Sequence, residues 1–350
     1  MDNIDSRLNS TAPALAKLWA QKYVKGLAHY AWETTASPAR GPDDTAAHLL
    51  EILRFASSQA WSKTESLLSQ EIQRHRIAPS LIDPWRIAND SRRLFEKAAE
   101  NYSKQVDPQV FSGNIAADCN QIRDHYTERD PRVLGFMSMQ FHYTGQILLE
   151  QVGPEERRVL SNYLKVMDDH LYMPLGRCYR AAAQHDYDDP VLQATREILP
   201  QTTEVAESIC AEVAQRFQGY ECQHGSLDNL EIRVSSVRDT EMFQVYLALC
   251  LLEGDLRAVQ QELFPLCVML YPPLKVHWGL VRTLLTLLEQ KLPYHLTSVN
   301  YELCLPVLRG FQDMFSPDVL PDDDPTWNQH PDTVRYMSAA QSLLKELTGS

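Results

Sequence analysis

Two consecutive stretches of the chain carry side chains that could bind a metal or a cofactor. The first contains His142, Tyr143 and Gln146, and the second contains Asp169 and His170. A neutral imidazole can bind a metal ion or act as an axial ligand of haem or another tetrapyrrole. Neighbouring hydroxyl, amide and carboxylate groups can orient such a ring. Because cores of helical bundles house sites of this kind, these five residues are the candidates for a cofactor-binding site, in a binding protein or in an enzyme that uses His142 and His170.

The spacing of the two histidines determines whether they can share a ligand. Periodicity predicts that His142 and His170 lie on adjacent antiparallel helices. If the turn between them is centred on Gly153, the two rings are offset by about six residues, or roughly 9 Å along the helix axis. The alternative interpretation is that the polar side chains form buried, hydrogen-bonded contacts between helices, as buried polar groups usually do. The sequence favours this alternative and leaves both open.

The sequence lacks the familiar catalytic motifs. It contains no His-Glu-x-x-His, no Gly-x-Ser-x-Gly and no glycine-rich phosphate loop. A di-iron carboxylate site would need two Glu-x-x-His pairs, and the single pair present, Glu221 and His224, lies in a predicted loop. We therefore assign no catalytic residues and no metal, expect no cofactor, and favour a protein that is not an enzyme.

Helices must position these side chains. Apolar residues recur three and four positions apart from about residue 9 onward, which predicts an all-α fold, a large multi-helix bundle or layered helical array. Asp83-Pro84 places a capping residue before a first-turn proline, and Pro265 should kink or interrupt its helix. The helices are expected at 9–34, 44–76, 84–104, 108–127, 131–151, 155–184, 190–218, 240–253, 256–270, 274–290, 298–315 and 332–347.

The division of the chain follows its loops. Alternation of apolar and polar residues predicts at most one short strand, near 230–234. We expect an N-terminal helical layer at 1–105, a central helical bundle at 108–218 and a C-terminal apolar helical layer at 230–350. The loop Gly219–Asn229 is the expected boundary between the last two. The sequence leaves open whether these layers are separate or form one continuous domain.

The most apolar part of the chain is Asp239–Gln290. Apolar side chains surround nearly the whole of Met242–Leu252, so this helix must be buried in a protein interior or an interface. Together with the lack of catalytic motifs, this predicts a non-enzymatic interaction protein, such as an assembly factor, adaptor or regulator, that self-associates or binds a protein partner. The candidate packing or interface anchors are Phe243, Tyr246, Trp278 and Leu284.

The acidic composition limits the classes of partner. The chain has 33 basic and 46 acidic residues, a formal charge of -13. Such a chain repels phosphate backbones, so a nucleic-acid role is not expected. A chaperone-like clamp for a basic client is a third hypothesis, which rests on this charge alone. Strong dependence of binding on salt would distinguish it from hydrophobic docking.

The lengths of the apolar stretches and the pattern of cysteines indicate the cellular compartment. The longest apolar stretches, 242–252 and 263–274, are shorter than the roughly twenty residues of a membrane span, and the N-terminus has no secretory pattern. The seven cysteines are odd in number and include no Cys-x-x-Cys, which is typical of a reducing compartment. We therefore expect a cytoplasmic protein without a transmembrane segment.

Two runs, Phe141–Gln146 and Asp168–Leu175, resemble sequences of uncharacterised all-helical cyanobacterial proteins. The resemblance extends over about residues 130–290. It implies a cytoplasmic or thylakoid-facing protein, with photosynthetic assembly or regulation as its context. It implies no activity and no catalytic residue.

Overall fold

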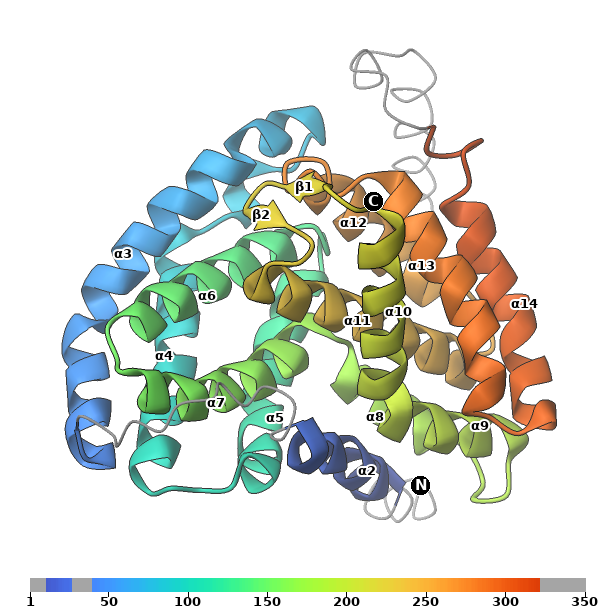
Figure 1. The fold of residues 1–350 in the computed structure, drawn as a ribbon, viewed down its shortest axis with the longest axis horizontal. Coiled ribbons are helices and arrows are strands. Elements are labelled where there is room, and N and C mark those ends of the chain that lie inside the picture. The colour runs from blue at the N-terminus through green and yellow to red at the C-terminus, as the bar shows by residue number, and fades with distance from the viewer. Residues whose placement is uncertain (1–10, 27–39, 322–350) are drawn as a thin grey trace.

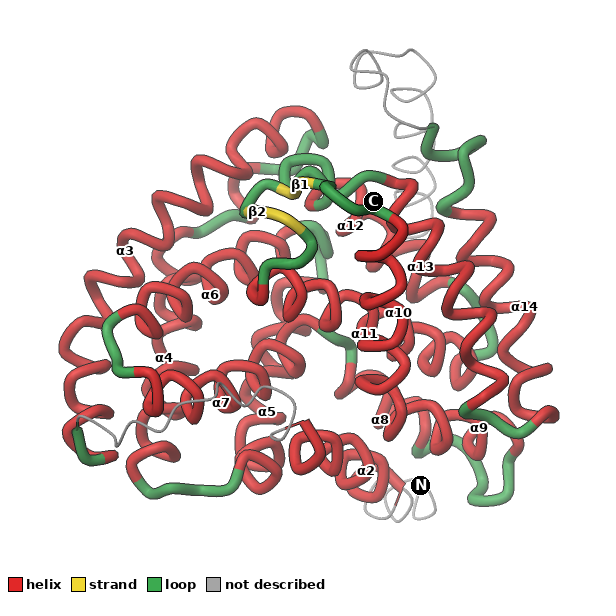
Figure 2. The backbone as a smooth tube through the Cα atoms, in the orientation of Figure 1, coloured by secondary structure: helices red, strands yellow, loops and turns green. Residues whose placement is uncertain are grey.

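The computed structural model describes residues 11–26 and 40–321, and 79% of this part is helical (Figure 1 and Figure 2). This confirms the all-α prediction. The helix predicted at 332–347 lies outside the described residues. The helices are α2 (Thr11–Gly26), α3 (Pro42–Arg74), α4 (Pro84–Ser103), α5 (Pro108–Thr127), α6 (Val133–Glu150), α7 (Pro154–Tyr172), α8 (Leu175–Ala182), α9 (Pro190–Ile198), α10 (Thr202–Arg216), α11 (Leu230–Glu253), α12 (Phe264–Leu270), α13 (Trp278–Lys291) and α14 (Ser298–Met314). Short 3-10 turns span Pro79–Leu81, Leu199–Gln201 and Leu292–Tyr294.

Proline and capping residues set several helix boundaries. The Asp83 side chain accepts hydrogen bonds from backbone N–H groups in the first turn of α4, as its place before a proline predicts. Pro174 separates α7 from α8, and Pro200 lies in the 3-10 turn between α9 and α10. Because proline lacks an amide hydrogen and crowds the preceding turn, the segment predicted at 155–184 is divided into two helices, and the segment predicted at 190–218 changes from α to 3-10 geometry and back.

The prediction of a short strand near 230–234 is also wrong, because these residues form the first turns of α11. The Asn229 side chain accepts a hydrogen bond from the Glu231 N–H (2.8 Å) and caps this helix. A five-residue alternation is too short to outweigh the apolar helix that continues from it. Within the described residues the strands are β1 (Glu221–Cys222) and β2 (Gly225–Ser226), which pair as an antiparallel hairpin.

The connection from α11 to α12 changes helical pattern twice. Gly254 ends α11 in the left-handed conformation (φ 70°), and its N–H donates to the Cys250 carbonyl (2.9 Å). Val259–Leu263 then forms a π turn, and α12 follows with Pro265 in its first turn. The interruption predicted for Pro265 is thereby confirmed.

Helix α11 lies at the centre of the fold, with α3, α4 and α6 on one side and α13 and α14 on the other (Figure 1). It packs against α8, α9, α10 and α14. Every residue from Thr240 to Leu252 is buried, so the all-round apolar helix lies in the protein interior. One contiguous core includes Trp19, Phe136 and Phe243, one from each predicted layer. The division into layers or domains remains a prediction.

No helix in the described ranges combines the length and the apolar content that a bilayer crossing requires. All seven cysteines are free thiols. The cytoplasmic location stays a prediction.

Candidate functional site

A cavity of about 600 Å³ lies between α6, α10, α11 and α13. Much of its wall is apolar and includes Met139 of α6, Ile209 of α10, Phe243 of α11 and Leu280 of α13. Small-molecule pockets have volumes of about 300–1,000 Å³ and combine apolar walls with a few polar groups. The cavity is therefore the candidate functional site.

Helix α6 contributes polar groups to the wall at helical spacing. Ser138 and His142 are one turn apart, and both line the cavity, as does Gln146 one turn further. The Ser138 hydroxyl is buried, and no described residue hydrogen-bonds to it. Burial lowers the pKa of His142 to about 4, and the nearby Arg238 acts in the same direction. His142 is therefore neutral near pH 7 and keeps a ring lone pair at the cavity wall.

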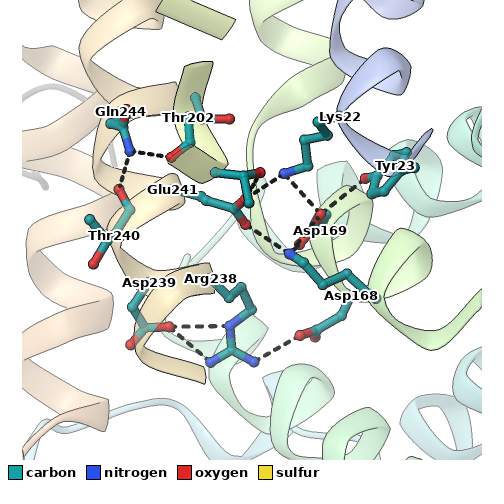
Figure 3. A network of polar contacts seen from close by, with 12 residues as sticks. Lys22, Tyr23, Asp168, Asp169, Thr202, Arg238, Asp239, Thr240, Glu241 and Gln244 are labelled. Carbon is teal, nitrogen blue, oxygen red and sulfur yellow. Dashed lines mark hydrogen bonds and ion pairs between the residues drawn. The ribbon is translucent and has the colours of Figure 1, made fainter. Parts of the chain in front are cut away.

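Helix α11 contributes an arginine between two carboxylates (Figure 3). Arg238 donates hydrogen bonds from Nη1 to Asp168 Oδ2 and from Nη2 to Asp239 Oδ1, both at 2.9 Å. Its guanidinium lies 4.4 Å from the centroid of the Tyr172 ring. Burial lowers the pKa of Arg238, but the two carboxylates outweigh burial and raise it. Burial raises the pKa of Asp239, and Arg238 and Tyr271 offset this only in part. One guanidinium thus faces two carboxylates, of which Asp239 lines this cavity.

The β1–β2 hairpin forms part of the wall through Cys222 and His224. His224 Nε2 lies 3.1 Å from the Tyr143 hydroxyl, which joins the hairpin to α6. The Gln223 N–H donates to the Leu274 carbonyl (3.0 Å), which joins the hairpin to the loop before α13. Burial raises the pKa of Tyr143 to about 12, so its hydroxyl keeps its proton at neutral pH. Hydrogen bonds therefore hold the hairpin to α6 and to the loop before α13.

A second cavity, of about 230 Å³, shares part of its lining with the first. His142, Gln146 and Arg238 line both cavities. The second cavity reaches Lys22 of α2 and Lys165 of α7. The polar groups at the shared wall therefore connect the first cavity to the charged residues described next.

Beside the second cavity, Lys22, Lys165, Asp169 and Glu241 form a closed arrangement that we call the four-charge cluster. Figure 3 labels Lys22, Asp169 and Glu241 of this cluster. Lys22 Nζ lies 3.1 Å from Asp169 Oδ2 and 2.9 Å from Glu241 Oε1. Lys165 Nζ lies 2.9 Å from Asp169 Oδ1 and 2.8 Å from Glu241 Oε2. Burial raises the pKa of Asp169, but the two lysines outweigh burial and lower it. Burial lowers the pKa of Lys22 in spite of both carboxylates. The cluster joins α2, α7 and α11.

His170 contacts α5 instead of a cavity. Its Nε2 lies 2.8 Å from Ser112 Oγ, and it lines neither of the two cavities. Burial lowers the pKa of His170 to about 4. The ring is therefore neutral in the folded protein above that pH.

Lowering the pH from 6.5, the ordinary pKa of the imidazole, to about 4 should destabilise the protein through His170. In this range the unfolded chain binds a proton at the ring and the folded chain does not, so acid favours unfolding. One pKa unit corresponds to about 1.4 kcal/mol. In His170→Gln, the loss of unfolding free energy between about pH 7 and about pH 4.5 should be smaller than in the wild type by about 2 kcal/mol. Urea titrations at the two pH values measure this, and equal losses would contradict it.

The structure brings together part of the predicted cofactor-binding set. His142 and Gln146 line both cavities, and Tyr143 holds the hairpin beside them. Asp169 belongs to the four-charge cluster, and His170 lies at α5. Gln146, Asp169 and His170 each hydrogen-bond to a residue of another helix, the last two in buried contacts.

The four predicted anchors lie in or beside the core. Phe243, Tyr246 and Trp278 are buried, and the half-buried Leu284 lines the first cavity. The Phe243 ring packs edge-on against Phe315, with centroids 5.6 Å apart. Phe243, Tyr246 and Trp278 are therefore packing residues within the chain. A role for any of the four anchors at an interface remains a prediction.

Sequence reasoning did not single out Arg238, Asp239 and Glu241. Their position in the sequence could have indicated that they are buried, because they directly precede the most apolar helical segment of the chain. Charged side chains are rarely buried unless they are paired, so charges beside such a segment indicate partners elsewhere in the fold. Asp168 and Asp169, which directly follow the apolar Val166 and Met167, carry the complementary signal.

Within the described ranges, no group of three or more His, Cys, Asp or Glu side chains is arranged to hold a metal ion. The chain matches no protein-family model, no curated protein and no solved structure. Its function is therefore argued from the chemistry of the cavity.

Proposed function

We propose that the protein is a helical ligand-binding protein that encloses a small, largely apolar molecule in the 600 Å³ cavity. The observation that carries the proposal is the cavity itself, which has the size and apolar wall of a ligand pocket. The buried Ser138 hydroxyl, which has no partner among the described residues, supports it. A buried polar group is normally satisfied, so a hydroxyl without a partner beside a cavity is unusual.

Binding without catalysis fits the polar wall. Arg238 and Asp239 are held in ion pairs, and Tyr143 is engaged with the hairpin, so these groups fix the shape of the wall. The proposal keeps His142 and Gln146 from the predicted cofactor-binding set and leaves out Asp169 and His170, which do not line the first cavity.

Ala214→Trp should weaken binding in the cavity by at least about tenfold. Ala214 lines the wall on α10, and an indole ring there would occupy space that a ligand needs. A loss of about 1.4 kcal/mol of binding free energy, from steric exclusion of the ligand, corresponds to about tenfold in affinity. The probe is N-phenyl-1-naphthylamine, a neutral apolar dye whose fluorescence rises in an apolar site.

The matched control is Ser208→Trp, on the exposed face of the same helix and away from the cavity. It should bind the dye as the wild type does, in saturable fashion with one dye per chain. Equal binding by wild type and Ala214→Trp would contradict the proposal, as would an absence of saturable binding by the wild type.

A second proposal is the interaction protein expected from the sequence: an assembly factor, adaptor or regulator. Its supporting observation is the exposure of large apolar side chains, with Trp85 86%, Tyr294 87% and Phe55 63% exposed. Exposed aromatic side chains are frequent at protein interfaces. A photosynthetic context for either proposal remains a prediction, and co-purification of a second polypeptide tests the interaction proposal.

A further inference from the structure

The two cavities, of about 600 and 230 Å³, meet along one strip of wall. Five residues line both of them and define this strip, which we call the junction: His142, Gln146, Glu231, Ser235 and Arg238. The first two turns of α11 have cavity lining on two faces, because Ile232 lines only the first cavity and Leu230 and Val234 line only the second. The two cavities therefore lie on either side of the start of α11.

His142 is a polar side chain at the junction without a hydrogen-bond partner among the described residues. The side chain is half-buried, and both ring nitrogens keep accessible surface. In this it differs from the Ser138 hydroxyl and from Nδ1 of His170, which surrounding atoms cover. Burial lowers the pKa of His142 to about 4, so the neutral ring carries one N–H donor and one acceptor nitrogen at pH 7. An uncharged oxygen of a ligand suits such a ring.

Other polar groups at the junction are already engaged. Gln146 Nε2 donates to Glu231 Oε2 (3.2 Å), and Arg238 is held by Asp168 and Asp239 (both 2.9 Å). An ionised group of a ligand would therefore lose its hydration without gaining a free partner of opposite charge. The junction favours a neutral ligand group.

Apolar wall extends from the junction into both cavities. Phe243 and Leu280 lie in the wall of the first cavity, and Leu149, Leu164 and Val234 lie in that of the second. Each CH₂ group that leaves water for an apolar wall favours binding. A molecule with one apolar chain gains these contacts in one cavity, and a molecule with two apolar arms gains them in both.

Resting on the proposed ligand-binding function, we propose that the bound molecule is an elongated, uncharged compound with a polar oxygen part-way along it, as in a ketone, an ester or a secondary alcohol. The oxygen hydrogen-bonds to His142 at the junction. One apolar arm lies in the first cavity, and the other passes the junction into the second. The two cavities then act as one bent binding site.

Three eleven-carbon probes test this: 6-undecanone, which has two equal arms, its isomer 2-undecanone, which has one long arm, and the hydrocarbon pentylbenzene. Each is used to displace N-phenyl-1-naphthylamine from the full-length protein. All three should displace the dye from the wild type. If none of them did, the ligand-binding function itself would fail.

Val234→Trp places an indole ring in the second cavity and leaves the lining of the first unchanged. It should weaken 6-undecanone by at least about tenfold, because one arm loses its place, and weaken 2-undecanone by less than about threefold. Leu230→Trp, at a 41% exposed residue that also lines only the second cavity, should act in the same direction and serves if Val234→Trp does not fold. Ser208→Trp, outside both cavities, should change neither affinity. Equal effects on the two isomers would overturn the two-cavity site and leave ligand binding standing.

His142→Phe keeps a ring at the junction and removes both of its hydrogen-bonding nitrogens. It should weaken the two ketones by about three- to tenfold, the contribution of a hydrogen bond, and should not weaken pentylbenzene. Circular dichroism and retained binding of pentylbenzene establish that the variant is folded. Unchanged affinity for both ketones, or equal loss of ketones and pentylbenzene, would contradict the assignment of the ligand oxygen to His142.

Discussion

Replacing Glu241 by alanine is expected to lower the free energy of unfolding by about 3–5 kcal/mol, because it breaks a buried ion-pair arrangement. Glu241 is fully buried and contacts both lysines of the four-charge cluster. Without it, Lys22 and Lys165 share Asp169, and one ammonium group is left buried without a balancing charge. Guanidinium unfolding followed by circular dichroism measures the loss as a shift of the midpoint at unchanged slope.

The matched control is Glu100→Ala, which breaks the exposed pair between Glu100 of α4 and Lys104, the residue that caps its C-terminus. Exposed pairs contribute about 0–1 kcal/mol, so this variant should unfold almost as the wild type does. If Glu241→Ala were no more destabilising than Glu100→Ala, the four-charge cluster would not be holding α2, α7 and α11 together.

Phe243→Asp should unfold the protein under conditions in which the wild type is folded. The Phe243 side chain is fully buried and contacts the rings of Phe311 and Phe315. Removing an aromatic ring from a core costs about 3–5 kcal/mol, and burying an unpaired carboxylate adds several more. The total is comparable to the whole stability of a typical domain, about 5–15 kcal/mol. Loss of the cooperative thermal transition, with a change in elution volume, is the expected result.

Phe55→Asp provides the comparison at an exposed phenylalanine on α3, 63% exposed. Substitutions at exposed positions usually change stability by less than about 0.5 kcal/mol, so its melting curve should follow the wild type. An unchanged melting temperature and an unchanged oligomeric state for Phe243→Asp would show that the ring is not a packing anchor.

Much of the fold could be predicted from local signals. Asp83-Pro84 marks the start of α4 and the Gly254 region marks the end of α11, because capping and backbone conformation are set by neighbouring residues. Apolar periodicity continues across Pro174 and Pro200, so it does not predict the changes in helical structure at these two prolines. The alternation at 230–234 was misleading because a helix and a strand share so short a pattern.

The candidate site was predictable only where it is local. Ser138, His142 and Gln146 share one helix, so their spacing places them on neighbouring positions of the wall. The contact between Lys22 and Glu241 joins residues 219 positions apart. The local sequence around either residue does not predict the other as its partner. Such pairs emerge from tertiary packing, which periodicity does not encode.

The two functional proposals differ in what should accompany the purified chain. A ligand-binding protein carries a small molecule in a cavity that the helices enclose, and an interaction protein carries a second polypeptide on its surface. The cavity favours the first proposal through its size and its largely apolar wall. The exposed aromatic side chains favour the second.

Native mass spectrometry of the protein isolated gently from its own host tests the central claim most directly. The account predicts a 40.0 kDa chain with one bound small molecule, absent from Ala214→Trp and retained by Ser208→Trp when both are prepared in the same way. A bare wild-type chain would contradict it. So would a chain that carries only a second polypeptide, which would instead establish the interaction proposal.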